Sequence, residues 1–508
     1  MLRKIRIVLA ALCFMLVTLL FLDFTGTVHT WFGWLAKIQF LPAVLAINAG
    51  IVVALVLLTL LLGRIYCSVI CPLGVMQDII AWWGRKVKKN RYTYSPARNV
   101  LRAVMLALFI VAMVAGFASA AALIAPYSAY GRIAQNLLAP VWQGANNLLA
   151  YAAERLDSYA FYTVDIWLKG IGTFVVAVAT LLLLWVLAWR NGRTWCNTVC
   201  PVGTVLGFIS RWSFMRPVID TSKCNGCGKC ARNCKAACID SKQHSIDYTR
   251  CVVCMDCLEQ CSQGAIYYEP RTITRRMELA EKVAAERAAA SPAEEGKADG
   301  MSRRKFLTLT ALFAFTAATR AQNKTVDGGL AAIEQKKMPA RKTPIVPAGA
   351  QSLKRFSQHC TGCQLCVSAC PNGVLRPSQD LTSLMQPVIS YERGYCRPEC
   401  TKCSEVCPTG AIKRIRRPEK SSTQIGRAVW IKDNCIPLVN GDSCGNCARH
   451  CPSGAITMVS SDPSREDAPK IPAVNTEMCI GCGSCEYLCP ARPFAAIYVE
   501  GNEVHHTI

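Results

Sequence analysis

The chain has 508 residues, of which 52% are hydrophobic, so it is long enough to form several domains. Its formal net charge of +24 at pH 7 would indicate a nucleic-acid partner in a soluble protein. Much of the Lys and Arg, however, lies just outside long apolar segments, where basic residues set membrane orientation. No nucleic-acid recognition motif is present, so we expect a lipid bilayer as partner and no nucleic acid.

Thirty cysteines are far more than a chain of this length usually contains, and they fall in short repeated clusters. Disulfide scaffolds are typical of small secreted domains, and this chain is not one. The cysteine pattern therefore favours metal ligation.

Four apolar segments are long enough to span a bilayer, since about 20 residues cross its hydrocarbon core. They are Ile5–Phe24, Phe40–Leu62, Leu101–Ala125 and Gly170–Trp189. Basic residues concentrate before the first segment, between the second and third, and after the fourth. By the positive-inside rule, the N-terminus and the chain after Trp189 are predicted to be cytoplasmic.

A C-x-x-x-C-P-x-G motif occurs at the predicted cytoplasmic ends of the second and fourth segments. It contains Cys67 and Cys71 in the first copy and Cys196 and Cys200 in the second. Cysteines at i and i+4 share one face of a helix, and the proline ends or bends that helix. The duplication disfavours four ordinary buried cysteines. It leaves two interpretations, a shared metal cluster or redox-active dithiols.

A bacterial two-cluster ferredoxin pattern follows the fourth segment. In this pattern the fourth cysteine of each motif ligates the other cluster. The predicted first set is Cys224, Cys227, Cys230 and Cys261, and the second is Cys251, Cys254, Cys257 and Cys234. Thiolates at this spacing select [4Fe–4S] clusters rather than zinc. Cys238 is a ninth cysteine and the alternative to Cys234 as a ligand.

Residues 271–300 read as a linker, and an unusual segment follows it. Ser302-Arg303-Arg304-Lys305-Phe306-Leu307 and the apolar run to Thr319 resemble a twin-arginine export signal. The alternative is a basic patch before a buried helix. If the signal is real, residues 301–321 carry it or a fifth membrane anchor, residues 322–351 form a tether, and the rest of the chain works outside.

The last sixteen cysteines form four quartets, each ending in C-x-x-x-C-P. The first two quartets are Cys360, Cys363, Cys366, Cys370 and Cys396, Cys400, Cys403, Cys407. The other two are Cys435, Cys444, Cys447, Cys451 and Cys479, Cys482, Cys485, Cys489. This pattern predicts four more [4Fe–4S] clusters with exchanged fourth ligands, but the spacing leaves open which quartets are partners.

The predicted fold class is an α-helical membrane domain plus α+β ferredoxin-like iron–sulfur domains. The membrane domain covers residues 1–215, the inner ferredoxin domain residues 216–270, and the outer polyferredoxin domain residues 352–508. Six [4Fe–4S] clusters are expected, two cytoplasmic and four periplasmic. The C-x-x-x-C-P cysteines would add a seventh cluster or redox dithiols.

These motifs resemble two known families joined in one chain. Residues 1–270 resemble the NapH-type membrane quinol dehydrogenases, through the four spans, the C-x-x-x-C-P pairs and the two-cluster ferredoxin. Residues 301–508 resemble the NapG/MauM-type ferredoxins, through the twin-arginine signal and the four quartets. The resemblance implies a protein of the bacterial inner membrane that passes electrons from the quinone pool to a periplasmic reductase or cytochrome.

Such a protein would be an electron-transfer subunit of the quinol dehydrogenase type without a terminal substrate site of its own. One alternative is a transmembrane conduit fed by a cytoplasmic donor, and another is a redox-sensing or maturation factor. A quinone headgroup on the outer side would need polar, protonatable residues. Those available there are Asp23, His29, Tyr127, Tyr130 and Glu154, each of which also fits an ordinary interfacial role.

Overall fold

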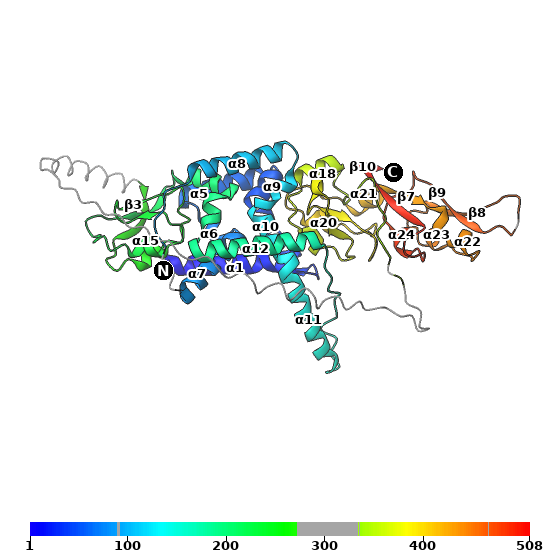
Figure 1. The fold of residues 1–508 in the computed structure, drawn as a ribbon, viewed down its shortest axis with the longest axis horizontal. Coiled ribbons are helices and arrows are strands. Elements are labelled where there is room, and N and C mark those ends of the chain that lie inside the picture. The colour runs from blue at the N-terminus through cyan, green and yellow to red at the C-terminus, as the bar shows by residue number, and fades with distance from the viewer. Residues whose placement is uncertain (89–91, 272–333, 335, 466) are drawn as a thin grey trace, which may run out of the picture.

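The structure is a computed structural model that describes residues 1–88, 92–271, 334, 336–465 and 467–508. The molecule is elongated (Figure 1), with a helical domain in the middle. The cysteine-rich region around residues 215–270 lies at one end and the C-terminal cysteine-rich module at the other. The twin-arginine segment, nearly all of the linker and part of the tether lie outside the described residues.

The helical domain is built largely from apolar helices that pack lengthwise. Its first half contains α1 (Leu2–Leu22), α2 (Thr27–Phe32), α3 (Trp34–Lys37), α4 (Phe40–Leu45), α5 (Ala49–Leu62), α6 (Ile65–Val69) and α7 (Pro72–Lys88). Its second half contains α8 (Asn99–Val114), α9 (Ala118–Ile124), α10 (Pro126–Ile133), the π-helical η1 (Ala134–Leu138), α11 (Ala139–Glu154), α12 (Ile171–Asn191), α13 (Thr194–Thr198) and α14 (Pro201–Ser210). Helix α7 packs against both α1 and α12, whereas α11 projects away from the bundle (Figure 1).

Two of the predicted spans form uninterrupted helices that are long and apolar enough to cross a membrane, α1 and α12, each of 21 residues. The other two are interrupted, and their longest helices, α5 and α8, have 14 and 16 residues. The segment 40–62 breaks at Ile47, whose φ is 55°, and the side chain of Asn48 then caps α5. The segment 101–125 breaks at Gly116, whose φ of 84° a helix cannot accommodate. Local backbone turns thus divide two segments that hydropathy alone makes continuous.

The region after α14 has two short helices and two antiparallel strand pairs. Strand β1 (Met215–Ile219) pairs with β4 (Ile266–Pro270), and β2 (Ile239–Asp240) pairs with β3 (Ser245–Ile246). Helices α15 (Lys229–Asn233) and α16 (Asp256–Gln260) each carry the third cysteine of one motif. A small core of its own contains Ala231, Ala236, Ile239 and Ile246.

The C-terminal module repeats this alternation of short helices and two-stranded sheets. The pairs are β5 (Leu375–Pro377) with β6 (Pro387–Ile389), β7 (Thr423–Trp430) with β10 (Ile497–Thr507), and β8 (Ile456–Ser460) with β9 (Lys470–Val474). The helices of its first part are α18 (Leu353–His359), α19 (Leu365–Ser368), η2 (Leu381–Ser383) and α20 (Lys402–Val406). Those of its second part are α21 (Arg417–Ser422), η3 (Lys432–Asn434), α22 (Ile436–Val439), α23 (Asn446–Arg449) and α24 (Ser484–Leu488).

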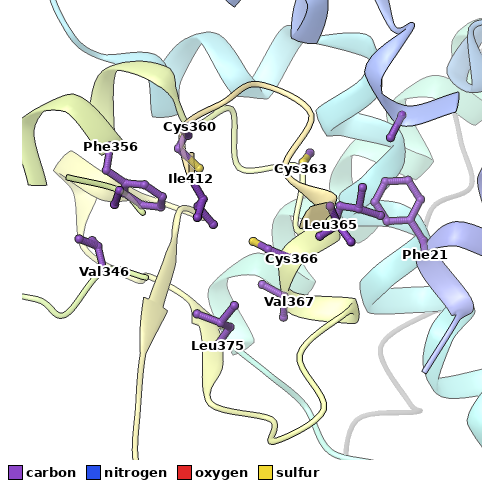
Figure 2. Packing of buried hydrophobic residues seen from close by; sticks show 14 of the residues in the cluster. Phe21, Val346, Phe356, Cys360, Cys363, Leu365, Cys366, Val367, Leu375 and Ile412 are labelled. Atoms are coloured by element: carbon purple, nitrogen blue, oxygen red, sulfur yellow. The ribbon is translucent and has the colours of Figure 1, made fainter. Parts of the chain in front are cut away.

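The C-terminal module packs directly on the helical domain through a continuous apolar core. Phe21 of α1 lies beside Leu365 of α19 (Figure 2), and both are almost completely buried. A polar contact stands next to them, in which Asn136 Nδ2 donates to Gln364 Oε1 at 3.0 Å. The beginning of the first C-terminal quartet is therefore fixed against the C-terminal end of α1.

Candidate metal centres

The eight motif cysteines of the inner region line two cavities. The first cavity is lined by Cys224, Cys227, Cys230 and Cys261. The second is lined by Cys234, Cys251, Cys254 and Cys257, with Cys238 beside them. The structure thus brings together the two sets that the spacing predicts, with the fourth cysteine of each motif in the other motif's cavity.

Cys234 and Cys238 compete for one position, because their sulfur atoms lie 3.5 Å apart. A hydrogen bond from the Cys238 thiol lowers the pKa of Cys234, and the nearby backbone amides of Cys238, Ala236 and Ala237 lower it further. Hydrogen bonds of this kind favour the thiolate, which is the form that binds metal. This geometry favours Cys234 as the ligand.

The C-terminal module answers the pairing question that the sequence leaves open. One cavity is lined by Cys370 of the first quartet and by Cys396, Cys400 and Cys403 of the second. Another is lined by Cys489 of the fourth quartet and by three cysteines of the third, Cys435, Cys444 and Cys447. The first quartet is therefore partnered with the second, and the third with the fourth.

The remaining cysteines complete this exchange. Cys366 interacts electrostatically with Cys363, Cys360 and Cys407. Cys485 does the same with Cys482, Cys479 and Cys451. The two halves of the module meet where the Cys396 amide donates to the Cys482 carbonyl at 2.9 Å.

The fourth cysteine of a motif commonly accepts a hydrogen bond from a backbone amide downstream. Ala265 N donates to Cys261 Sγ at 3.2 Å, Ile412 N to Cys407 Sγ at 3.4 Å, and Ala496 N to Cys489 Sγ at 3.3 Å. Amides aimed at a sulfur stabilise a thiolate and raise the reduction potential of a cluster bound to it. The residues thus fit an iron–sulfur cluster in donor chemistry as well as in number.

A single metal ion would need its ligands drawn closely around one point. Across the described residues, no group of three or more His, Cys, Asp or Glu is arranged in that way. The quartets surround cavities instead, and this is the space that a cluster of several atoms requires.

The C-x-x-x-C-P pairs converge between α6, α7, α13 and α14. Cys67, Cys71, Cys196 and Cys200 are all buried, each at 5% exposure or less. Cys200 interacts electrostatically with the other three. The two cysteines of each pair lie on either side of a junction between two helices. Cys67 lies in α6 and Cys196 in α13. Cys71 and Cys200 come directly before the prolines that begin α7 and α14.

Two buried arginines, which the motif reading missed, connect the two copies. Arg64 and Arg193 precede Cys67 and Cys196 by three residues, and both are fully buried. Arg193 Nη1 donates to the Cys67 carbonyl at 2.8 Å, while Arg64 Nη2 donates to the Cys196 carbonyl at 3.4 Å. Each arginine therefore braces the opposite copy. The sequence carries a signal for this, because Gly-Arg precedes both motifs at the same distance.

Each motif needs its glycine, because the helix that follows the motif passes close to the backbone of the motif's first cysteine. A Cβ on Gly203 would lie 2.1 Å from the Cys196 carbonyl oxygen, and one on Gly74 would lie 2.3 Å from that of Cys67. The same Cβ on Gly74 would lie 2.6 Å from Arg193 Nη1. Only a residue without a side chain lets the helix pass beside the cysteine turn.

Several donors around these four cysteines have no partner. Arg64 Nε, Arg193 Nη2 and Trp195 Nε1 are buried without a hydrogen bond to any described residue. Nor does Arg64 form an ion pair with an acidic side chain in the described part of the chain. An uncompensated buried charge costs on the order of several kcal/mol. A negatively charged group among the four sulfurs would supply the missing partner.

Asp78 of α7 connects this centre with the inner cysteine region. Its carboxylate pairs with Arg193 Nε at 2.7 Å, with Lys235 Nζ at 3.0 Å and with Arg6 Nη1 at 3.0 Å. Burial would raise the pKa of Asp78, but the charges of Arg193 and Lys235 outweigh that effect and hold the pKa well below its usual range. The Arg193 amide also donates to the Lys235 carbonyl at 2.8 Å.

The five outer residues considered for a quinone headgroup do not form one site. Asp23 pairs with His29 Nδ1 at 3.0 Å. Tyr127 and Tyr130 are almost fully buried against Phe21 at the contact with the C-terminal module. Glu154 lies exposed at the end of the projecting α11. Packing and ion pairing therefore account for four of the five, and Glu154 lies apart from them.

Two family models match the chain, and both describe iron–sulfur domains. A 4Fe-4S binding domain matches residues 46–91 and 171–217, which contain the C-x-x-x-C-P pairs. A 4Fe-4S dicluster domain matches residues 359–411 and 442–492. The first of these dicluster matches covers the first and second C-terminal quartets, in line with the pairing described above.

Curated relatives are ferredoxin-type proteins. The methylamine utilization ferredoxin-type protein MauM of Paracoccus denitrificans is 32% identical over 179 residues, which is 34% of this chain and 79% of MauM. The ferredoxin-type protein NapG of Escherichia coli K12 is 31% identical over 197 residues, 35% of this chain and 84% of NapG. YccM of Escherichia coli K12, an electron transport protein by name, is 28% identical over 226 residues, 44% of this chain and 55% of YccM.

The alignment thus spans only about half the length of YccM. No solved structure matches the chain. The folds and the cysteine sites define a 4Fe–4S protein of the ferredoxin type. Within that class, the chain belongs to the ferredoxin-type proteins of the NapG and MauM kind.

The glycine contacts predict a large difference between two alanine substitutions. Gly203→Ala places its Cβ against a backbone oxygen, so we expect a loss of about 1–3 kcal/mol in the free energy of unfolding. Gly172→Ala in α12 meets nothing within 4 Å and serves as the control. Thermal unfolding in detergent measures both, and equal effects would contradict the close-approach argument.

The contacts of Cys234 predict which of two neighbouring cysteines binds metal. Cys234→Ser should lower the iron content by about four atoms per chain, whereas Cys238→Ser should leave it unchanged. Iron and acid-labile sulfide assays of the purified variants make the comparison. The reverse result would make Cys238 the ligand.

Proposed function

We propose that this protein is a membrane-bound iron–sulfur electron-transfer protein that carries electrons from membrane quinol to a periplasmic reductase or cytochrome. The observation that carries the proposal is the order of the cysteine sites along the molecule. The two inner sites lie at one end of the helical domain, the C-x-x-x-C-P pairs lie within that domain, and the four outer quartets belong to the module at its other end (Figure 1). Each [4Fe–4S] cluster takes up and returns one electron.

The proposed membrane arrangement uses four crossings, two of them through interrupted segments. Helices α4 and α5 would together form the second crossing, and α8 and α9 the third, each with a turn between its two helices. The inner ferredoxin region would then be cytoplasmic and the C-terminal module periplasmic. The position of the two modules at opposite ends of the helical domain supports this topology.

The C-x-x-x-C-P cysteines are proposed to hold a seventh cluster rather than to act as dithiols. Two buried guanidinium groups reach this centre, and one of them, Arg64, has no acidic partner among the described residues. A [4Fe–4S] cluster with four thiolates carries negative charge, whereas neutral thiols or a disulfide do not. The 4Fe-4S binding domain that matches these segments supports the same conclusion.

An alternative direction of entry has one observation in its favour. Cys227 of the first inner site is exposed, so a soluble cytoplasmic donor could approach that site. In this case electrons would enter through the inner ferredoxin region rather than from quinol. The two routes share every cysteine site and differ only in the donor.

Reduction by quinol tests the proposed donor. We expect the purified protein to show the EPR signals of reduced clusters when it is mixed with a reduced quinol under anaerobic conditions. Dithionite reduces the clusters directly, without a quinol site, and so gives the full EPR signal for comparison. If quinol produces no signal that dithionite produces, quinol is not the donor.

Iron counting tests the seventh cluster. Replacement of Cys67, Cys71, Cys196 and Cys200 by serine should remove about four irons and four sulfides per chain. Replacement of Cys13, a half-buried cysteine of α1 outside every motif, should remove none. An unchanged iron content in the fourfold variant would indicate dithiols.

A further inference from the structure

A cavity of about 590 Å³ lies between α1 and α7 and belongs to none of the cysteine quartets. Its length follows α1 from Arg3 to Leu19, which corresponds to about 24 Å of helix. Most of its surface is apolar, formed by side chains that include Ile7, Ala11, Phe14, Met15, Leu19 and Ile79. One end is different, because charged side chains gather there.

The charged end contains both acidic and basic groups. They are Arg3, Arg6, Asp78, Arg85, Lys235 and Asp256. The carboxylate of Asp78 accepts from Arg6 and Lys235, and Lys235 Nζ lies 3.1 Å from Asp256. Arg6 is buried, and its Nε has no hydrogen-bond partner among the residues that the structure describes. A ligand here would meet hydrogen-bond acceptors and donors side by side.

This end of the cavity touches two of the cysteine centres. Lys235 directly follows Cys234 of the second inner site, and Asp256 lies between two cysteines of the same site. Asp78 also binds Arg193, whose Nη1 lies 3.9 Å from Cys196 Sγ. A molecule bound at the charged end would therefore lie next to groups that surround both the inner site and the C-x-x-x-C-P centre.

We propose that this cavity is the quinol-binding site, with the isoprenoid tail along α1 and the headgroup at Asp78 and Arg6. The inference rests on the proposed function and locates its donor on the inner side of the membrane domain. An uncharged quinol headgroup needs an acceptor for its hydroxyl hydrogens and a donor for the carbonyl oxygens that replace them. The Asp78 carboxylate and the Arg6 guanidinium supply both.

The reaction at this site balances without a further reactant. Both O–H bonds of the quinol break, and the ring becomes a quinone with two carbonyl groups. Two protons leave to water at the charged end, and two electrons pass singly to the neighbouring iron–sulfur centres, which are the oxidant. Arg3, Arg6 and Lys235 favour loss of the first proton, because positive charges stabilise the anion that remains.

Hydrogen-bonding capacity distinguishes a quinol from a phospholipid phosphate at this end. A phosphate diester only accepts hydrogen bonds, so it would use the arginines but leave the carboxylates of Asp78 and Asp256 without a donor. A quinol uses both kinds of group. Anionic lipid therefore serves as the competing occupant in the test.

The test uses full-length protein in detergent and a photoreactive azidoquinone with an isoprenoid tail. We expect the label on residues 7–19 of α1 or 75–85 of α7, with loss of the label when unlabelled quinol is added in excess. Label confined to the outer segment 127–154 would overturn the proposal. So would a label that excess phosphatidylglycerol removes and quinol does not.

A matched pair of variants separates the cavity from the rest of the membrane surface. Ala11 and Ala179 are both exposed on apolar helices, but only Ala11 lines the cavity. Ala11→Trp should reduce labelling and the rate of quinol-driven cluster reduction about tenfold, equivalent to ~1.4 kcal/mol of binding. Ala179→Trp should change neither. Dithionite-reduced EPR signals of normal size show that both variants are folded and loaded.

The two proposals fail in different ways. If quinol reduces the clusters of the wild type and of Ala11→Trp at the same rate, the cavity is wrong and quinol remains the donor. If the cavity is labelled as expected but quinol reduces no cluster, the binding site stands and the proposed electron donor is wrong.

Discussion

The positive charge buried beside the four C-x-x-x-C-P sulfurs constrains much of this structure. Arg64 and Arg193 have no exposed surface, and each reaches across to the cysteine turn of the other copy. Burying a guanidinium is costly unless its donors are satisfied and its charge is compensated. Arg193 has Asp78 as a partner, whereas Arg64 relies on neutral oxygens, those of Asn197 and Thr249 among them. A cluster bound by the four thiolates, as we propose, would supply the negative charge that Arg64 lacks.

This network also attaches the inner cysteine region to the helical domain. Arg64 donates a hydrogen bond to the Thr249 carbonyl, and the Arg193 amide donates one to the Lys235 carbonyl. Asp78 forms an ion pair with Lys235. All three connections end within two residues of a predicted cluster ligand, either Cys234 or Cys251. The two predicted inner cluster sites are thus held at a fixed position relative to the C-x-x-x-C-P centre, so electron transfer between them would need no domain movement.

The sequence alone predicts those features of the fold and site that depend on residues close together in the chain. Cysteine spacing defines a loop and short helix that bind one cluster corner after another, so the quartets were recognisable without the fold. The sequence does not show which outer quartets exchange ligands, because that pairing depends on how separate loops pack against one another. Hydropathy identified four segments but not the turns at Ile47 and Gly116, which depend on a few backbone angles. The sequence likewise does not reveal that Tyr127 and Tyr130 pack on Phe21, because that contact forms between separate helices, and this packing separates them from the other candidate headgroup ligands.

The contact between the helical domain and the C-terminal module repeats the arrangement of buried cations next to thiols. Arg132 is fully buried near Cys363, and Lys169 lies near Cys370 and Cys366. Burial lowers the pKa of Lys169 to about 8, although the neighbouring sulfurs act in the opposite direction. A loaded cluster brings negative charge to this contact, while an empty one leaves the two cations uncompensated in an apolar interface. We therefore expect the C-terminal module to dock most tightly on α1 when its first cluster is bound, because the charge of that cluster would compensate both cations.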